Sequence, residues 1–240
     1  MTKLLSFGIL ITLAAGSQLT GQESPSPSPS AEESPTATAT ATPATATSGS
    51  ATVRNIPLRF VPPPLEGTIA LGIWDSNDKL VRVLQREAKI DTFTVEENSL
   101  STTWDGKSDT GEDLAAGKYR ARGFLVGKLK IEDLGKAASS PPTAADRISL
   151  KLVTNPLNSD TRAIMEVAVA FDPSGSFLKT TDGLPLATLS RTPNLIRVAI
   201  EKNGEKAADV WQEDSSGPEH LRVSNIDKIM AFDCGYFELK

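Results

Sequence analysis

Apolar side chains at every second position are the feature that most constrains the fold of this chain. Ile69, Leu71 and Ile73 alternate with small or polar residues, and positions 196–200 repeat the pattern. Successive side chains of a β-strand point to opposite faces, so this spacing gives a strand one apolar face. The sequence contains no convincing amphipathic helix. We therefore expect an all-β protein.

Turn signals divide the chain after position 53 into two regions. Residues 74–78 form a turn-rich connection between two apolar runs, and Asn203-Gly204 is a strong hairpin signal in the second region. Between them, an Ala-, Ser- and Pro-rich stretch surrounds Pro141-Pro142. The sequence predicts a β domain at 53–130, a linker at 131–145 and a small antiparallel β domain at 146–240.

The chain start has the order of parts of a secretory signal peptide. Lys3 precedes an apolar run at 4–15, which is followed by the small residues Gly16 and Ser17. The run is shorter than the roughly 20 apolar residues that span a bilayer, which disfavours an uncleaved anchor. Lipidation would need a cysteine just after the run, and the single cysteine is Cys234. We expect residues 1–21 to be removed, and the protein to be exported to the periplasm, the outer cell surface or the medium.

Residues 22–52 consist almost entirely of Ser, Pro, Thr and Ala. The only charged side chains in this segment are Glu23, Glu32 and Glu33. Such a composition cannot bury enough apolar surface to offset the entropy of chain ordering. We expect a disordered linker that can hold the folded part at a distance from an attachment point.

The net charge of the chain argues against a nucleic-acid partner, although one predicted strand carries a row of cationic side chains. A net charge of -5 and a pI near 5.1 predict no nucleic-acid partner, and no integral membrane span is expected after signal cleavage. Lys118, Arg120 and Arg122 share one face of a predicted strand. We expect this face to be solvated.

The stretch from Trp104 to Tyr119 is the most distinctive sequence motif in the chain. We expect Trp104 to be buried, and Gly106, Gly111 and Gly117 to serve turns. The carboxylates of this stretch are expected to be solvated, so that replacing Asp109 or Glu112 by Ala changes stability by well under about 1 kcal/mol.

Chemical motifs are incomplete throughout the sequence. Residues 111–118 have five residues between the glycines where a phosphate loop has four. Lys107 and Thr110 interrupt the spacing of a calcium loop, although a structural calcium ion stays open as an alternative. His220 is the only histidine. Cys234 is expected to lie on an apolar strand next to that of His220, buried as a small hydrophobic side chain. The sequence predicts no catalytic residue, no cofactor-binding residue and no metal ligand.

Residues 54–127 resemble the immunoglobulin-like domain of flagellar hook-capping proteins. The resemblance rests on the run 67–75, the run 80–84, Trp104-Asp105-Gly106-Lys107 and Ala116-Gly117-Lys118-Tyr119. It implies an immunoglobulin- or fibronectin III-like β-sandwich and no activity. The segment that builds the hook cap has no counterpart, its place being taken by the linker. No family is recognised for 146–240.

These features favour a non-enzymatic exported envelope protein that acts as a structural spacer or protein-binding module. Its expected partner is an envelope or extracellular protein. The alternative is an accessory ligand- or carbohydrate-binding component of an extracellular enzyme system. Clustered exposed aromatics would favour glycan binding, but Trp74, Trp104 and Trp211 are each expected in a core.

Overall fold

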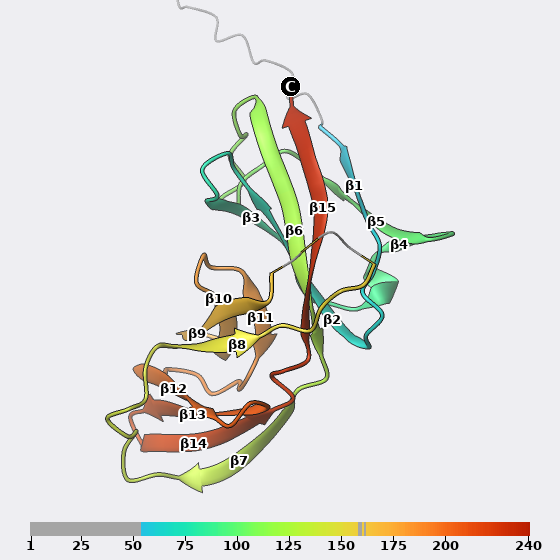
Figure 1. Ribbon diagram of the computed structural model, residues 1–240. Coiled ribbons are helices and arrows are strands. Elements are labelled where there is room, and N and C mark those ends of the chain that lie inside the picture. Colours follow the sequence, from blue (N-terminus) through green and yellow to red (C-terminus); the bar gives the residue numbers. More distant parts are fainter. Residues whose placement is uncertain (1–53, 158–159, 161) are drawn as a thin grey trace, which may run out of the picture. The chain divides into compact units, whose positions relative to one another are not determined.

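The described part of the chain is built almost wholly from β-strands. The computed structural model describes residues 54–157, 160 and 162–240, and the predicted signal peptide and linker lie outside them. Fifteen strands and one 3-10 helix, Ile90–Thr92, make up the secondary structure of these residues (Figure 1). The predicted all-β class is confirmed.

Two antiparallel sheets form the first sandwich. One has the strand order β1-β5-β4 and the other β15-β6-β2-β3. Their facing side chains build two apolar clusters, one around Phe60 and Phe232 and the other around Trp104 and Tyr119. The strands are β1 (Ile56–Phe60), β2 (Gly67–Trp74), β3 (Leu80–Ala88), β4 (Thr94–Glu96), β5 (Ser99–Trp104), β6 (Gly117–Gly127) and β15 (Ile229–Leu239).

Two further antiparallel sheets form the second sandwich. Their orders are β11-β10-β9-β8 and β12-β13-β14-β7, and side chains from both sheets, such as Leu178 and Val210, belong to one apolar cluster. The strands are β7 (Lys130–Lys136), β8 (Arg147–Lys151), β9 (Ile164–Asp172), β10 (Gly175–Thr180), β11 (Pro185–Thr188), β12 (Arg197–Asn203), β13 (Ala207–Asp214) and β14 (Gly217–Ser224).

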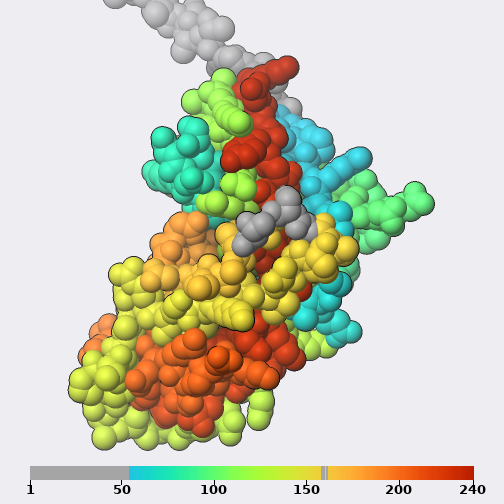
Figure 2. All heavy atoms as spheres, in the orientation of Figure 1, coloured from blue at the N-terminus to red at the C-terminus, as the bar shows by residue number. Residues whose placement is uncertain are grey.

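The second sandwich is inserted between two neighbouring strands of the first. The chain leaves the first sandwich at the end of β6 and returns as β15, which pairs with β6 from Ile229 opposite Val126 onward. Gly127 N donates a hydrogen bond of 2.7 Å to Lys228 O, so the outgoing and returning connections lie side by side. Val153, just after β8, also pairs with Met230 of β15, and Figure 2 shows this yellow segment against the red strand.

Two segments differ from the sequence-based expectation. The predicted linker at 131–145 contains most of β7, which pairs with β14. All seven residues of β7 are exposed, so the strand shows no apolar alternation. The run 229–239 was expected in the second domain and instead completes the first sandwich. Its apolar pattern identifies a strand but carries no information about the strand's partner.

The central strands of the first sandwich are buried on both faces. Ile69 and Leu71 of β2 point into the first sandwich, whereas Ala70 and Trp74 belong to the cluster that fills the second. The two sandwiches therefore share apolar packing across one sheet. Inside the first sandwich, Gly123 leaves room for its neighbours, because a Cβ there would lie 2.4 Å from Ala70 O and 2.6 Å from the Phe232 ring.

Candidate functional site: a groove where three sheet edges meet

Trp104 anchors the loop that joins β5 to β6. Its side chain is 1% exposed, as predicted, and its Nε1 donates a hydrogen bond of 2.9 Å to Lys107 O. Gly106 and Gly111 adopt φ values of +77° and +81°, which fits their predicted role in turns. Gly117 does not have a positive φ and begins β6. The loop is therefore built around a buried aromatic anchor.

Asp109 of this loop covers the free edge of β3. Its Oδ1 accepts a hydrogen bond of 2.9 Å from Val83 N, and its own N–H donates to Val81 O at 3.2 Å. Arg82 donates from Nη1 to Ser108 O at 2.6 Å and fixes the loop at the same place. The expectation that Asp109 is an ordinary solvated side chain is wrong in this respect, because it takes the place of a neighbouring strand.

The other carboxylates of the loop each have a separate partner. Asp105 accepts from Lys107 N, and Glu112 accepts from Thr110 Oγ1 at 3.0 Å. The hydrogen bond from Lys107 Nζ to Asp113, 2.9 Å long, lowers the pKa of Asp113. Within residues 54–157, 160 and 162–240, no three His, Cys, Asp or Glu side chains gather in a way that could hold a metal ion. The arrangement stabilises the loop conformation.

Cys234 and His220 lie on strands of different sheets and not on neighbouring strands. Cys234 is half-buried, not fully buried as expected; it packs against both apolar clusters of the first sandwich, and desolvation raises the pKa of its thiol. The thiol therefore stays protonated at neutral pH. The His220 ring stacks on Trp211 with centroids 4.7 Å apart, and its Nε2 lies 3.6 Å from Asp209 Oδ1. The structure places these two groups in separate surroundings.

The predicted cationic face on β6 exists but is not fully solvated. Lys118 and Arg120 lie over the Tyr236 ring, with distances of 4.5 and 4.9 Å to its centroid. Arg122 lies over the Trp74 ring at 4.4 Å, and its side chain is only 16% exposed. Burial lowers the pKa of Arg122. This face is packed against aromatic rings, which the two-residue spacing alone could not show.

A groove of about 410 Å³ lies between the two sandwiches. Three of the strands around it, β3, β7 and β11, are each the outer strand of their sheet. An outer strand carries backbone groups without a neighbouring strand, and such edges can pair with another chain. The lining consists of Gly67, Thr68, Glu87, Lys89, Val126, Gly127, Lys128, Leu129, Ile131, Ala187 and Thr188.

Glu87 holds the two sandwiches together at the wall of this groove. Its Oε1 accepts a hydrogen bond of 2.9 Å from Thr188 N, and its Oε2 accepts one of 2.6 Å from Thr188 Oγ1. Its φ of +47° lies in the left-handed region, which costs a non-glycine residue about 1–3 kcal/mol and is concentrated at functional sites. The strained conformation aims the carboxylate from β3 at β11.

The sequence did not predict the groove. Its lining residues come from strands widely separated along the chain, and β7 was not expected to be a strand. The one local signal is Gly67, where a Cβ would lie 2.0 Å from Val126 O. A glycine at a strand start marks close backbone approach but does not identify the partner.

No family model, no curated protein and no solved structure matches this chain. The resemblance of residues 54–127 to hook-capping immunoglobulin-like domains therefore stays a prediction. In the part of the chain that the structure describes, no helix has the length and apolar character needed to cross a membrane.

Proposed function

We propose that this chain is a non-enzymatic exported protein of the cell envelope that acts as a spacer and protein-binding module. The observation that carries the proposal is the apolar groove bordered by β3, β7 and β11. Edge strands around an apolar depression suit an extended polypeptide, which can add backbone hydrogen bonds to the edge and place a side chain in the depression.

The size and lining of the groove fit a side-chain anchor of a partner. Its volume of about 410 Å³ lies near the lower end of the range of small ligand sites. Val126, Leu129 and Ala187 give it an apolar lining, and Ile131 at the side is 39% exposed. Interfaces derive most of their affinity from a few such anchors in pockets.

The surroundings of the reactive side chains also support a binding role. The Cys234 thiol is held in its protonated form by burial, and the His220 ring stacks on Trp211. Neither group borders the groove. The predicted signal peptide and linker would supply export and reach.

The test is photo-crosslinking in the intact envelope of the native host. A photoreactive amino acid replaces Ile131 in the groove or, as a control, Val95 on β4, which is 68% exposed and does not belong to the groove lining. We expect a discrete polypeptide adduct from position 131 and none from position 95. Equal adducts from both positions, or no polypeptide adduct from position 131, would contradict the proposal.

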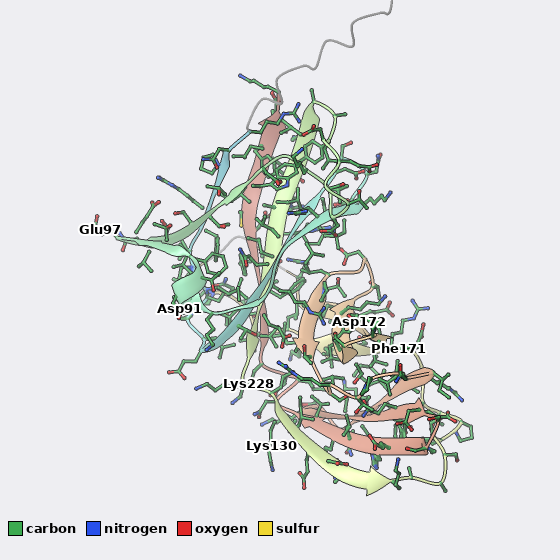
Figure 3. All side chains as sticks on the ribbon, turned by 180° about the vertical axis from the view of Figure 1, so that it is seen from behind. Asp91, Glu97, Lys130, Phe171, Asp172 and Lys228 are labelled. Atoms are coloured by element: carbon green, nitrogen blue, oxygen red, sulfur yellow. The ribbon has the colours of Figure 1, made fainter. Side chains whose placement is uncertain are left out.

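A second candidate function, carbohydrate binding, has one specific observation in its favour. Phe171 is 41% exposed and borders a depression of about 320 Å³ together with Asp172 and Asn194. Figure 3 labels Phe171 and Asp172. An exposed ring beside carboxylate and amide groups can stack on a sugar and accept its hydroxyl hydrogen bonds. Binding on a glycan array that disappears in Phe171→Ala would favour this function over the first.

A further inference from the structure

We infer that the groove recognises a partner segment in which an apolar side chain stands beside a carboxylate. This inference rests on the proposed protein-binding function and names the chemistry of the ligand. It follows from the apolar lining of the groove and from the positive charge along its rim.

The lining supplies the apolar half of the site. Val126 and Ala187 are 2% and 6% exposed, and Leu129 packs against the same apolar cluster. Ile131 is partly exposed at the side. An apolar side chain of a partner would lose water contact on several sides here, which is favourable by about 25 cal/mol per Å² of apolar surface buried.

Lysines supply the charged half. Lys89 and Lys128 belong to the lining. Lys228 adjoins it, since a Cβ on Gly127 would lie 2.8 Å from the Lys228 Cβ. Lys130 begins β7 nearby, and Figure 3 labels Lys130 and Lys228 where the second sandwich joins the first. Neither Lys89 nor Lys228 forms an ion pair with any residue that the structure describes.

Two carboxylates lie close to these lysines. Glu87 belongs to the lining and keeps its negative charge, but both of its oxygens are directed at Thr188, from which they accept hydrogen bonds. Glu66 pairs with Lys128 at 3.1 Å, but the two side chains are 87% and 82% exposed, so the pair is weak and Lys128 can exchange it for a ligand carboxylate. Among the described residues, Lys89 and Lys228 therefore have no ion-pair partner, and both lie at an apolar surface.

A polypeptide is the occupant that best fits both halves. The outer edge of β7, whose seven residues are all exposed, offers backbone hydrogen bonds that a peptide can use and a lipid chain cannot. A peptide with an acidic residue next to an apolar one would place its carboxylate near the lysines while the apolar side chain enters the groove.

Two fluorescent probes separate apolar from charged recognition on the full mature chain. Anilinonaphthalene sulfonate has an apolar body and an anionic group, and N-phenylnaphthylamine is a neutral analogue. We expect the double variant Lys89→Glu, Lys128→Glu to bind the anionic probe about tenfold more weakly and the neutral probe within about twofold of wild type. The control is Lys79→Glu, Lys240→Glu, which makes the same change of net charge at exposed positions away from the groove.

The outcomes distinguish this inference from the proposed function. If wild type binds both probes and Ile131→Ser weakens both, but the lysine variant behaves like its control, the groove binds ligands and the charge inference is overturned. If wild type binds neither probe and position 131 yields no crosslink, the proposed function fails as well. Thermal melts of every variant establish that the fold is retained.

Competition identifies the source of the ligand. A blocked pentapeptide of alternating leucine and glutamate should displace the anionic probe, and the same peptide with glutamine for glutamate should displace it at least about fivefold less well. Displacement by decanoate at lower concentrations than the acidic peptide would overturn the assignment to a polypeptide and favour an acyl chain.

Discussion

Single side chains in this protein replace contacts that a sheet would ordinarily supply. Asp109 covers the edge of β3 from one side, and Glu87 ties the same strand to β11 of the other sandwich. Both residues are acidic and at least partly exposed, so their sequence context resembles that of solvated surface charges. Their importance follows from the backbone N–H groups that donate hydrogen bonds to them. The local sequence does not show which N–H groups these are.

Replacing Asp109 by Ala removes the acceptor of Val83 N–H and should lower the free energy of unfolding by about 1 kcal/mol, the usual net value of one hydrogen bond. Glu112→Ala in the same loop should change it by under about 0.5 kcal/mol. Urea denaturation measures both. Equal losses at the two positions would show that Asp109 is only a surface charge.

Glu87 permits a test of backbone strain. Glu87→Ala removes both hydrogen bonds to Thr188 but keeps a side chain at a φ of +47°. Glu87→Gly loses the same hydrogen bonds and relieves the strain, so it should be more stable than Glu87→Ala by about 1 kcal/mol. The comparison uses the denaturation midpoints of the two variants. A glycine variant less stable than the alanine variant would mean that the left-handed conformation is not strained.

Trp104 provides the matching test of core packing. Its ring is 1% exposed and lies 5.5 Å from the rings of both Tyr119 and Phe237, measured between centroids. Trp104→Ala should therefore lower the free energy of unfolding by about 3–5 kcal/mol. Val95→Ala, at a side chain that is 68% exposed, serves as the control and should lie within about 0.5 kcal/mol of wild type.

At the scale of strands, the sequence predicts which segments are extended far better than which segments pair. The alternation at Ile69, Leu71 and Ile73 identifies β2, because burial on one face dictates every second residue. β7 escapes prediction because an exposed edge strand has no apolar face. The partner of β15 is also invisible locally, since pairing with β6 joins residues more than a hundred positions apart.

The candidate site was unpredictable for the same reason. Trp104 and its turn glycines lie close together in sequence, and their roles could be inferred from spacing and residue type. The groove depends on β7 and β11 lying beside β3, which only the tertiary fold determines. Lys89 and Lys128 read individually as solvated charges, and their common location requires the structure.

Cys234 reports whether β15 is docked on β6. The thiol lies between the two apolar clusters of the first sandwich, with a raised pKa. Alkylation should be at least about a hundredfold slower than for an exposed thiol, and should accelerate only when denaturant detaches the strand. The variant Ser215→Cys, Cys234→Ser provides the exposed reference. Equal rates in the two proteins without denaturant would show that β15 is loosely attached.

At the scale of the whole molecule, the two sandwiches are nested and share apolar packing. Residues 128–228 leave and return through adjacent connections, and the cluster that fills the second sandwich includes Trp74 and Phe124 of the first. An insertion anchored at both ends and packed on its host should unfold with it. The chain order alone had indicated two consecutive domains.

A shortened chain tests the nesting directly. Joining residues 54–127 to 228–240 through a two-residue Asn-Gly turn keeps all seven strands of the first sandwich, since Gly127 N already donates a hydrogen bond to Lys228 O and the next pair is Val126 opposite Ile229. This chain should give a β-sheet circular dichroism spectrum and a cooperative melt, at a lower temperature than the mature protein because Trp74 loses the side chains that cover it.

Residues 54–130 alone lack β15 and with it Phe232, whose ring stacks on Phe60 at 4.6 Å. They should show no cooperative melt, because half of the β6 pairing and part of the core are missing. A cooperative transition in 54–130 as sharp as in the joined chain would mean that β15 is dispensable and that the two sandwiches fold as consecutive domains.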